Sequence, residues 1–213
     1  KVDRIRDGKS FTTRRVMAVQ HGQAIFTMSI SFQVHEDGLS HHFQMPAVTT
    51  PDQLLGEDEI RAEQAKTWPL EFQESFTGSS AIELRPIEPL DMLNPKKTEP
   101  VQRCWMRCGE RLPDDPRLHQ CVLAYLSDWS LLDTATRPHG ISFVQHNIQV
   151  ASLDHAMWFH RPFRADEWLL YDQDSPSASG ARGFNRGLIY NQAGELVAST
   201  TQEGLMRVHA DSR

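Results

Sequence analysis

Long hydrophobic runs, paired cysteines and an excess of positive charge are all missing from this sequence. No apolar stretch approaches the roughly 20 residues that a membrane-spanning helix needs, so no membrane span is expected. The net charge of −6 argues against a nucleic-acid partner, because neutralising phosphates requires clustered Lys and Arg. The chain has three cysteines, which is an odd number and too few for a disulfide framework. This indicates a reducing compartment, and we expect a cytoplasmic protein.

Several familiar catalytic and metal-binding signatures are also missing. The sequence has no Gly-x-Ser-x-Gly elbow, His-Glu-x-x-His pair, phosphate-binding loop or dinucleotide fingerprint. Cys104 and Cys108 have no second Cys or His pair at zinc spacing, and the pair His41 and His42 has no carboxylate or cysteine at such spacing. We therefore expect semi-buried thiols, a solvated histidine loop, and neither cofactor nor metal.

What the sequence does contain is typical of a globular protein. Its 213 residues are 39% hydrophobic and 23% charged, which is enough apolar material to bury a core. The chain begins at Lys1 in a predicted strand, without an initiator Met or a signal sequence. This beginning is consistent with a fragment of a longer protein.

Hydrophobic periodicity divides the chain into three parts, residues 1–34, 35–80 and 81–213. The first part predicts three strands, and the second predicts a connecting segment with one helix over 52–66. The third predicts strands, one helix and a terminal hairpin with a turn at Ala193-Gly194. The predicted strands are 2–5, 11–20, 23–34, 81–87, 101–108, 149–159, 167–174, 182–191 and 195–208.

The strongest helix signal covers residues 115–133. Asp115 is a suitable N-cap, and Pro116 occupies the first helical position, where its missing N–H is not needed. Apolar residues recurring at steps of three and four predict a buried stripe. Asp128 lies on the edge of that stripe, where a carboxylate needs polar partners or serves chemistry. The predicted stripe consists of Leu118, Val122, Tyr125, Trp129 and Leu132.

The N-terminal hairpin matches the C-terminal hairpin when it is shifted by 172 positions. The turn residue Gly22 falls on Gly194, and Ile25 falls on Val197. Ile30 falls on Gln202, so one copy has an apolar residue where the other has an amide. Other aligned pairs are Arg14 with Arg186, Val16 with Leu188, Gln20 with Gln192, and Thr27 with Ser199.

Several segments of the sequence together resemble a known protein family. Segments in fixed order across most of residues 100–208, together with residues 6–8 and 10–33, strongly resemble the acyl-CoA thioesterase II family. The segments are Ser127-Asp128, Arg137-Pro-His-Gly140, Ser152-Leu-Asp-His-Ala-Met-Trp-Phe-His-Arg-Pro-Phe163, Glu167-Trp-Leu-Leu-Tyr171, Ala181-Arg-Gly183 and Gln202-Glu-Gly-Leu-Met-Arg207.

The resemblance implies an α+β, double hot-dog fold, in which an antiparallel sheet wraps a long central helix, with the first unit incomplete here. It also implies hydrolysis of fatty acyl-CoA thioesters by a water that an aspartate, a hydroxyl residue and a glutamine activate. By similarity these residues are Asp128, Ser152 and Gln202. The family pattern has Thr where this chain has Ser152, which keeps the hydroxyl but loses the methyl that restricts its rotamer.

Each of these residues has a structural interpretation when considered alone. Asp128 is then more often a hydrogen-bonding group than a base, and Ser152 and Gln202 are ordinary strand residues. Two other functions stay open: a non-catalytic acyl-CoA-binding or scaffolding protein and, with less support, a hydratase or dehydratase.

Other polar residues near these segments are assigned to structure. Asp154 and His155 are sequence neighbours, and neighbours on a strand point to opposite faces; His160 is assigned likewise. Arginines at 161, 182 and 186 could bind coenzyme A phosphates or form surface ion pairs. Because an incomplete unit exposes apolar sheet, we expect a homo-oligomer, or completion of the unit by residues outside this sequence.

Overall fold

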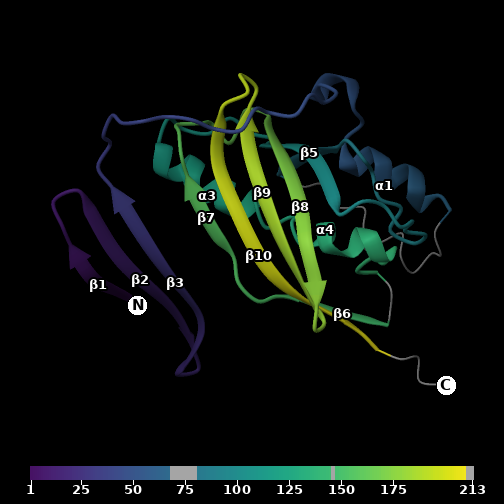
Figure 1. Cartoon of the computed structure of the whole chain (residues 1–213), viewed down its shortest axis with the longest axis horizontal. Coiled ribbons are helices and arrows are strands. Elements are labelled where there is room, and N and C mark those ends of the chain that lie inside the picture. Colours follow the sequence, from purple (N-terminus) through teal and green to yellow (C-terminus); the bar gives the residue numbers. More distant parts are fainter. Residues whose placement is uncertain (68–80, 145–146, 210–213) are drawn as a thin grey trace. The chain divides into compact units, whose positions relative to one another are not determined.

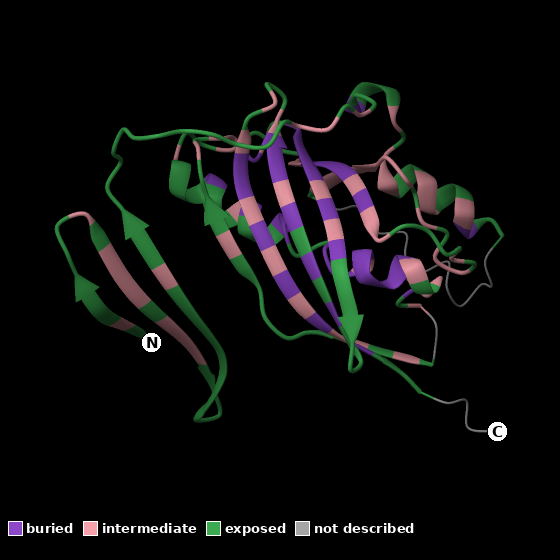
Figure 2. Ribbon diagram, in the orientation of Figure 1, coloured by how far each residue is buried: buried purple, intermediate pink, exposed green. Residues whose placement is uncertain are grey.

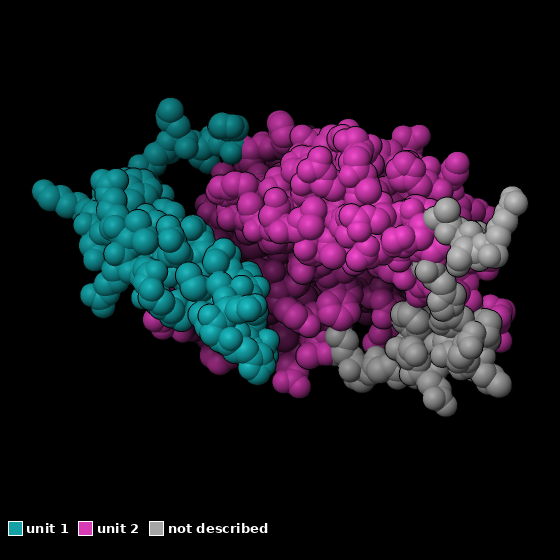
Figure 3. All heavy atoms as spheres, turned by 90° about the horizontal axis from the view of Figure 1, so that it is seen from below, with its two compact units in different colours: residues 1–41 teal, residues 42–213 magenta. Residues whose placement is uncertain are grey.

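The computed structural model describes residues 1–67, 81–144 and 147–209. The chain forms two compact units, residues 1–41 and residues 42–213, coloured teal and magenta in Figure 3. The division into 1–34, 35–80 and 81–213 stays a prediction, and its residues 68–80 lie outside the described ranges. None of the helices in those ranges is long and apolar enough to cross a bilayer.

The first unit is a three-stranded antiparallel sheet in the order β1-β2-β3. Its strands are β1 (Val2–Asp7), β2 (Phe11–Gln20) and β3 (Gln23–Gln33). The turn between β2 and β3 has two residues with positive φ, His21 at 51° and Gly22 at 78°. This backbone matches the right-handed twist of a tight hairpin, and it explains the glycine at the turn.

The second unit is a seven-stranded antiparallel sheet with helices against it (Figure 1). The strand order is β4-β5-β8-β9-β10-β6, and β7 also pairs with β10. The strands are β4 (Ile82–Pro86), β5 (Val101–Cys108), β6 (Ile148–Ser152), β7 (Ala156–Phe159), β8 (Leu169–Ser179), β9 (Arg182–Asn191) and β10 (Leu196–Val208). The helical elements are η1 (Pro51–Gln53), α1 (Glu57–Ala65), α3 (Pro116–Leu126), α4 (Asp133–Thr136) and η3 (Arg137–His139).

Alternate residues of the central strands enter two different cores, and Figure 2 shows the resulting bands of burial along β8, β9 and β10. On one face Met106, Tyr171 and Ile189 pack with Leu123 and Leu126, the latter two from α3. The opposite face has its own cluster of Trp105, Trp168, Leu170 and Tyr190, against which partly buried residues of the 45–54 segment pack. The sheet is therefore covered on both faces near Leu170 and Tyr190, where apolar residues follow in succession, whereas residues 182–187 of β9 alternate between exposed and buried.

The predicted helix over 115–133 is confirmed at its beginning and wrong at its end. The Asp115 side chain accepts a hydrogen bond from the Arg117 backbone N–H, as an N-cap does. The helix α3 ends at Leu126, and the next backbone bonds are of the tighter i→i+3 type, from Asp128 to Tyr125 and from Trp129 to Leu126. The long central helix is thus replaced by α3, a turn over 127–132, and α4.

The predicted buried stripe of that helix is also wrong, except at Leu132 and at Val122, which is partly buried and packs against the core. Tyr125 is 63% exposed, and Trp129 and Leu118 are 38% and 37% exposed. The residues that face the sheet are His119, Leu123 and Leu126. These are again spaced by three and four, so α3 has apolar residues on both sides, and periodicity alone could not decide which side is buried.

The two hairpins of the repeat share an irregularity. A one-residue bulge leaves Ile25 without a partner in β3 and Val197 without one in β10, and these are residues that the repeat aligned. The partner strands are offset, because Ile30 faces Arg14 whereas Gln202 faces Asn185. The shift of 172 therefore holds for the second strand of each hairpin and is one residue too long for the first.

Candidate active site

The turn after α3 places Asp128 against β10, where its side chain contacts Gln202. Ser127 is fully buried, and its Oγ donates to the Ala124 carbonyl at 2.9 Å. From below, the Tyr171 hydroxyl donates to the Ser127 carbonyl, also at 2.9 Å. These bonds fix the backbone immediately before Asp128, whose own side chain is 54% exposed. Asp128 is therefore held on a rigid base with its carboxylate at the surface.

The structure brings the three predicted site residues into contact. Gln202 Nε2 donates one hydrogen bond to Asp128 Oδ1 and another to Ser152 Oγ at 3.0 Å. Ser152 is the last residue of β6, and it pairs with Gly204 on β10. Because Gln202 lies two residues before Gly204, its side chain points to the same face of β10. Pairing between β6 and β10 thus sets two of the three residues.

A buried amide lies beneath two exposed oxygen groups in this cluster. Gln202 is 0% exposed, whereas Ser152 and Asp128 are exposed. The orientation of the amide is fixed, since the opposite one would put two oxygens against each other at Asp128. The Gln202 Oε1 atom is buried and has no hydrogen-bond partner among the residues that the structure describes. An unpaired buried polar atom calls for an explanation, and a catalytic role is one of several.

His155 is a neighbour of Asp128 that the sequence analysis assigned to structure. Its Nδ1 lies 3.7 Å from Asp128 Oδ1, and its Nε2 lies 2.9 Å from Ser127 Oγ. The argument from strand alternation does not apply, because the predicted strand 149–159 is broken into β6 and β7 with residues 153–155 between them. No Gly or Pro marks that break in the sequence, so the pattern gave no signal for it.

Asp154 and His160, which were assigned to structure together with His155, make hydrogen bonds away from Asp128. Asp154 accepts a hydrogen bond from the Glu203 backbone N–H at 2.8 Å. His160 Nε2 lies 2.9 Å from Ser199 Oγ, at an exposed position. Burial lowers the pKa of both histidines, and the Asp128 and Asp154 carboxylates oppose this shift at His155, whereas Arg161 adds to it at His160.

Beneath the cluster, Tyr171 connects the turn to the sheet. Its hydroxyl also pairs with Thr200 Oγ1 at 2.8 Å, and burial raises its pKa well above the usual range. The ring passes directly over Gly187, where an added Cβ would lie 2.2 Å from Tyr171 Cε2. A glycine is therefore needed at position 187 because the Tyr171 ring occupies the place of a Cβ, and not because of the backbone conformation.

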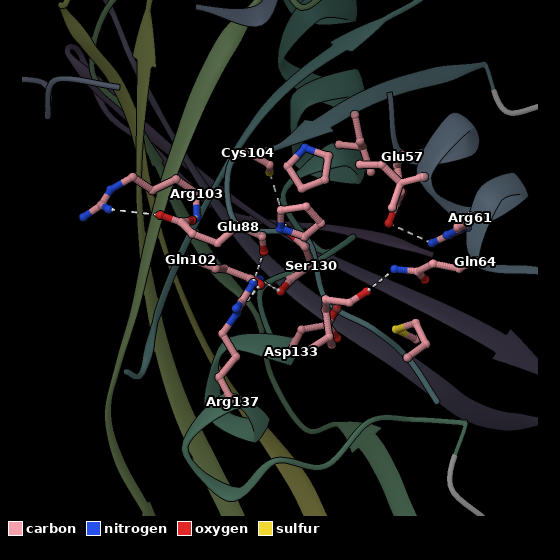
Figure 4. Close-up of a pocket in the computed structure, with 16 residues that line it drawn as sticks. Glu57, Arg61, Gln64, Glu88, Gln102, Arg103, Cys104, Ser130, Asp133 and Arg137 are labelled. Carbon is pink, nitrogen blue, oxygen red and sulfur yellow. Dashed lines mark hydrogen bonds and ion pairs between the residues drawn. The ribbon is translucent and has the colours of Figure 1, made fainter. Parts of the chain in front are cut away.

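A separate cavity of about 70 Å³ lies between α1, the β4–β5 edge and α4 (Figure 4). Its wall is mixed: Leu84 and Met92 line it together with polar pairs. Arg61 donates to Glu57 at 2.8 Å, and Arg137 donates to Gln102 at 3.0 Å. Burial raises the pKa of Asp133 to about 8, and it raises the pKa of the Cys104 thiol to about 12. Cys104 is therefore a protonated thiol and not a nucleophile.

The described part of the chain holds no group of three or more His, Cys, Asp or Glu residues placed to bind a metal ion. Arg186 forms two 2.8 Å hydrogen bonds to Asp174, and Arg182 lies 3.6 Å from Glu203. Arg161 donates to the Leu196 carbonyl at 2.8 Å. All three arginines thus have partners within the chain.

Comparison with known sequences identifies the family. The family model described as "Acyl-CoA thioesterase" matches residues 72–205. The human protein "Acyl-coenzyme A thioesterase 8" is 39% identical over 217 residues, which cover 98% of this chain and 67% of that protein. "Acyl-CoA thioesterase 2" of Haemophilus influenzae is 37% identical over 206 residues, which cover 97% of this chain and 72% of that protein.

Comparison with solved structures identifies the fold. An acyl-CoA thioesterase II, TesB2, from Mycobacterium marinum matches with a TM-score of 0.75 and 47% identity, over 98% of this chain and 73% of that one. A protein from Alicyclobacillus acidocaldarius with a hot dog fold has the same TM-score at 18% identity, over 99% of this chain and 72% of that one. The α+β hot-dog fold is thus confirmed, while a double unit with an incomplete first half stays a prediction. The chain belongs to the acyl-CoA thioesterase family.

Proposed function

We propose that the chain hydrolyses fatty acyl-CoA thioesters to a free fatty acid and coenzyme A, using a water activated by Asp128, Ser152 and Gln202. The observation that carries this proposal is the double hydrogen bond from the Gln202 amide to Asp128 and Ser152. Three segments of chain, 50 and 74 residues apart, supply these groups. In contact, a carboxylate, a hydroxyl and an amide can together hold a water and take a proton from it.

The chemistry assigns one task to each group. Asp128 accepts a proton from water as the water oxygen bonds to the thioester carbonyl carbon. Gln202 uses both amide hydrogens on Asp128 and Ser152, so the Ser152 hydroxyl hydrogen is left to orient the water. The tetrahedral intermediate then collapses with cleavage of the C–S bond. Since an alkyl thiol such as that of Cys has a pKa of about 8.5, the thiolate leaves with little help from an acid.

Two other functions predict different results in one assay. A non-catalytic acyl-CoA-binding protein would bind fatty acyl-CoA without releasing thiol. A hydratase or dehydratase would change the absorbance of an enoyl-CoA without releasing thiol. Release of free coenzyme A, followed with a thiol reagent, therefore separates hydrolysis from both.

The decisive comparison is between the unchanged chain, Asp128→Asn and Asp154→Asn. Asp128→Asn should lower turnover of a fatty acyl-CoA by about 10²-fold or more, the scale of a lost general base. Asp154→Asn is the matched control, because its amide oxygen can still accept the Glu203 N–H. Thiol release by Asp128→Asn at the unchanged rate would remove Asp128 from the mechanism, and binding without release by the unchanged chain would favour the non-catalytic function.

A further inference from the structure

His155 contacts the proposed base but has no part in the proposed mechanism so far. Its ring spans the space between two consecutive residues of the turn after α3, with Nε2 at 2.9 Å from Ser127 Oγ and Nδ1 at 3.7 Å from Asp128 Oδ1. The imidazole side chain is 23% exposed, so it is largely enclosed in this place. The inference below rests on the proposed function, because it assigns a task relative to Asp128.

The hydrogen bonds of Ser127 determine which nitrogen of neutral His155 carries the proton. The Ser127 hydroxyl has a single hydrogen, which it donates to the Ala124 carbonyl at 2.9 Å. With that hydrogen on the Ala124 carbonyl rather than on Met157 Sδ, which lies farther away at 3.8 Å, the Ser127 oxygen accepts from His155, and we assign the proton of the neutral ring to Nε2. Nδ1 of the neutral ring therefore presents a lone pair to the Asp128 carboxyl.

Burial keeps the His155 ring neutral near pH 7, although two carboxylates face it. Burial lowers the pKa of His155, and the two carboxylates that face it, Asp128 from the turn after α3 and Asp154 from its own loop, only partly offset this. The other contacts of the Ser127 hydroxyl beside it are neutral, the Ala124 carbonyl and Met157 Sδ at 3.8 Å. A neutral imidazole with a free lone pair can accept a proton.

We propose that His155 is a positioning residue that takes up at Nδ1 the proton which Asp128 removes from the attacking water. The proton leaves the water oxygen as its bond to the carbonyl carbon forms, moves to the Asp128 carboxylate and passes to Nδ1. The resulting imidazolium, paired with the restored carboxylate, gives the proton to the departing thiolate or to solvent. The 3.7 Å separation is that of an ion pair, so transfer requires the half-exposed Asp128 side chain to turn toward the ring.

The test replaces His155 with Gln, whose amide can keep an N–H near the position of Nε2 but has no basic nitrogen. If His155 only anchors Ser127, His155→Gln keeps its turnover. If it accepts the proton, kcat falls by about tenfold or more with little change in KM. We expect a smaller loss than the loss of about 10²-fold or more that follows removal of a general base. The matched control is His160→Gln, which removes a histidine of lowered pKa that contacts Ser199 instead; it should stay within about twofold of the unchanged chain.

The pH profile and a double variant test the route through Asp128. The unchanged chain should lose kcat as pH falls through the His155 pKa, which lies below the ordinary value of about 6.5, and His155→Gln should lose this acid limb. In an Asp128→Asn background, His155→Gln should cause no further loss. A full additional loss there, or unchanged kcat for His155→Gln in the wild-type background, would overturn the proposal.

Nuclear magnetic resonance of the ¹⁵N-labelled chain provides a readout that does not depend on turnover. Above the His155 pKa, Nε2 should carry the proton and Nδ1 should be bare. Asp128→Asn should lower the His155 pKa, because it removes a carboxylate that raises it. A proton on Nδ1 of the neutral ring would refute this inference. The same His155 pKa in Asp128→Asn and in the unchanged chain would also refute it. Unchanged turnover of Asp128→Asn, by contrast, would refute the proposed function.

Discussion

Gln202 donates a hydrogen bond from Nε2 to Oδ1 of Asp128, across 74 residues of chain. The same nitrogen donates to Ser152, so both hydrogens of one buried amide are used within the cluster. A side chain that satisfies two partners in this way fixes the distance between them. Changes at Gln202 should therefore affect the geometry and the charge of the site together.

Gln202→Glu should abolish most of the activity. The new carboxylate has no hydrogen to donate and lies against Asp128, and two carboxylates at such a distance cannot both ionise easily. We expect kcat on a fatty acyl-CoA to fall by about 10²-fold or more at pH 7. Gln149→Glu, at an exposed position of β6, is the control and should change kcat less than about twofold. Activity of Gln202→Glu equal to that of the unchanged chain would contradict the proposed site.

Ser152 should tolerate a change that keeps its hydroxyl and not one that removes it. Ser152→Thr restores the family's residue type and restricts the rotamer, so kcat should stay within about threefold. Ser152→Ala removes one hydrogen bond to the water, worth roughly 1–1.5 kcal/mol, or about tenfold in kcat. Steady-state rates of both variants check this, with Ser199→Ala as a control away from the cluster. Equal rates for Ala and Thr at position 152 would exclude a role for the hydroxyl.

Gly187→Ala should destabilise the second unit through the Tyr171 ring. A Cβ at this position would lie 2.2 Å from the Tyr171 ring and 2.6 Å from Thr200 Oγ1. Overpacking of this kind lowers the free energy of unfolding by about 1–3 kcal/mol. Urea unfolding measures the change, and Gly38→Ala is the control, because nothing lies within 4 Å of a Cβ there. A free energy of unfolding unchanged in Gly187→Ala would show that the Tyr171 ring moves aside freely.

Asp133 should make the folded state less stable as pH rises. Its folded pKa of about 8 is above the unfolded value of about 3.9, so the unfolded chain loses this proton first, and stability falls between about pH 4 and pH 8. Asp133→Asn cannot titrate. Its midpoint of thermal unfolding, relative to the unchanged chain, should therefore increase over this range and stay constant above it.

The control for that series is Asp37→Asn, because the Asp37 side chain is fully exposed. Its difference from the unchanged chain should be flat between pH 4 and pH 8. An Asp133→Asn difference that is equally flat would mean that the Asp133 carboxyl ionises as readily in the folded chain as in the unfolded one.

Local pattern was sufficient wherever local chemistry decides the structure. The bounds of β2, β5 and β9 agree with the predicted strands 11–20, 101–108 and 182–191, because alternation and turn residues act within a few positions. The N-cap at Asp115 is local in the same sense. The end of α3 was missed because the residues after Leu126 continue a helical spacing, while a hydrogen bond from the Tyr171 hydroxyl takes up the Ser127 carbonyl in the turn.

The sequence by itself determined the residue types, the strand pattern and the family resemblance, and with them Asp128, Ser152 and Gln202 as candidates. Only the tertiary structure decided that these three meet, that the buried side of α3 is the one with Leu123 and Leu126, and that His155 lies against Asp128. The physical reason is register. A slip of one residue between β6 and β10 would put the Ser152 and Gln202 side chains on opposite faces of the sheet, and no short stretch of sequence contains the contacts that prevent such a slip.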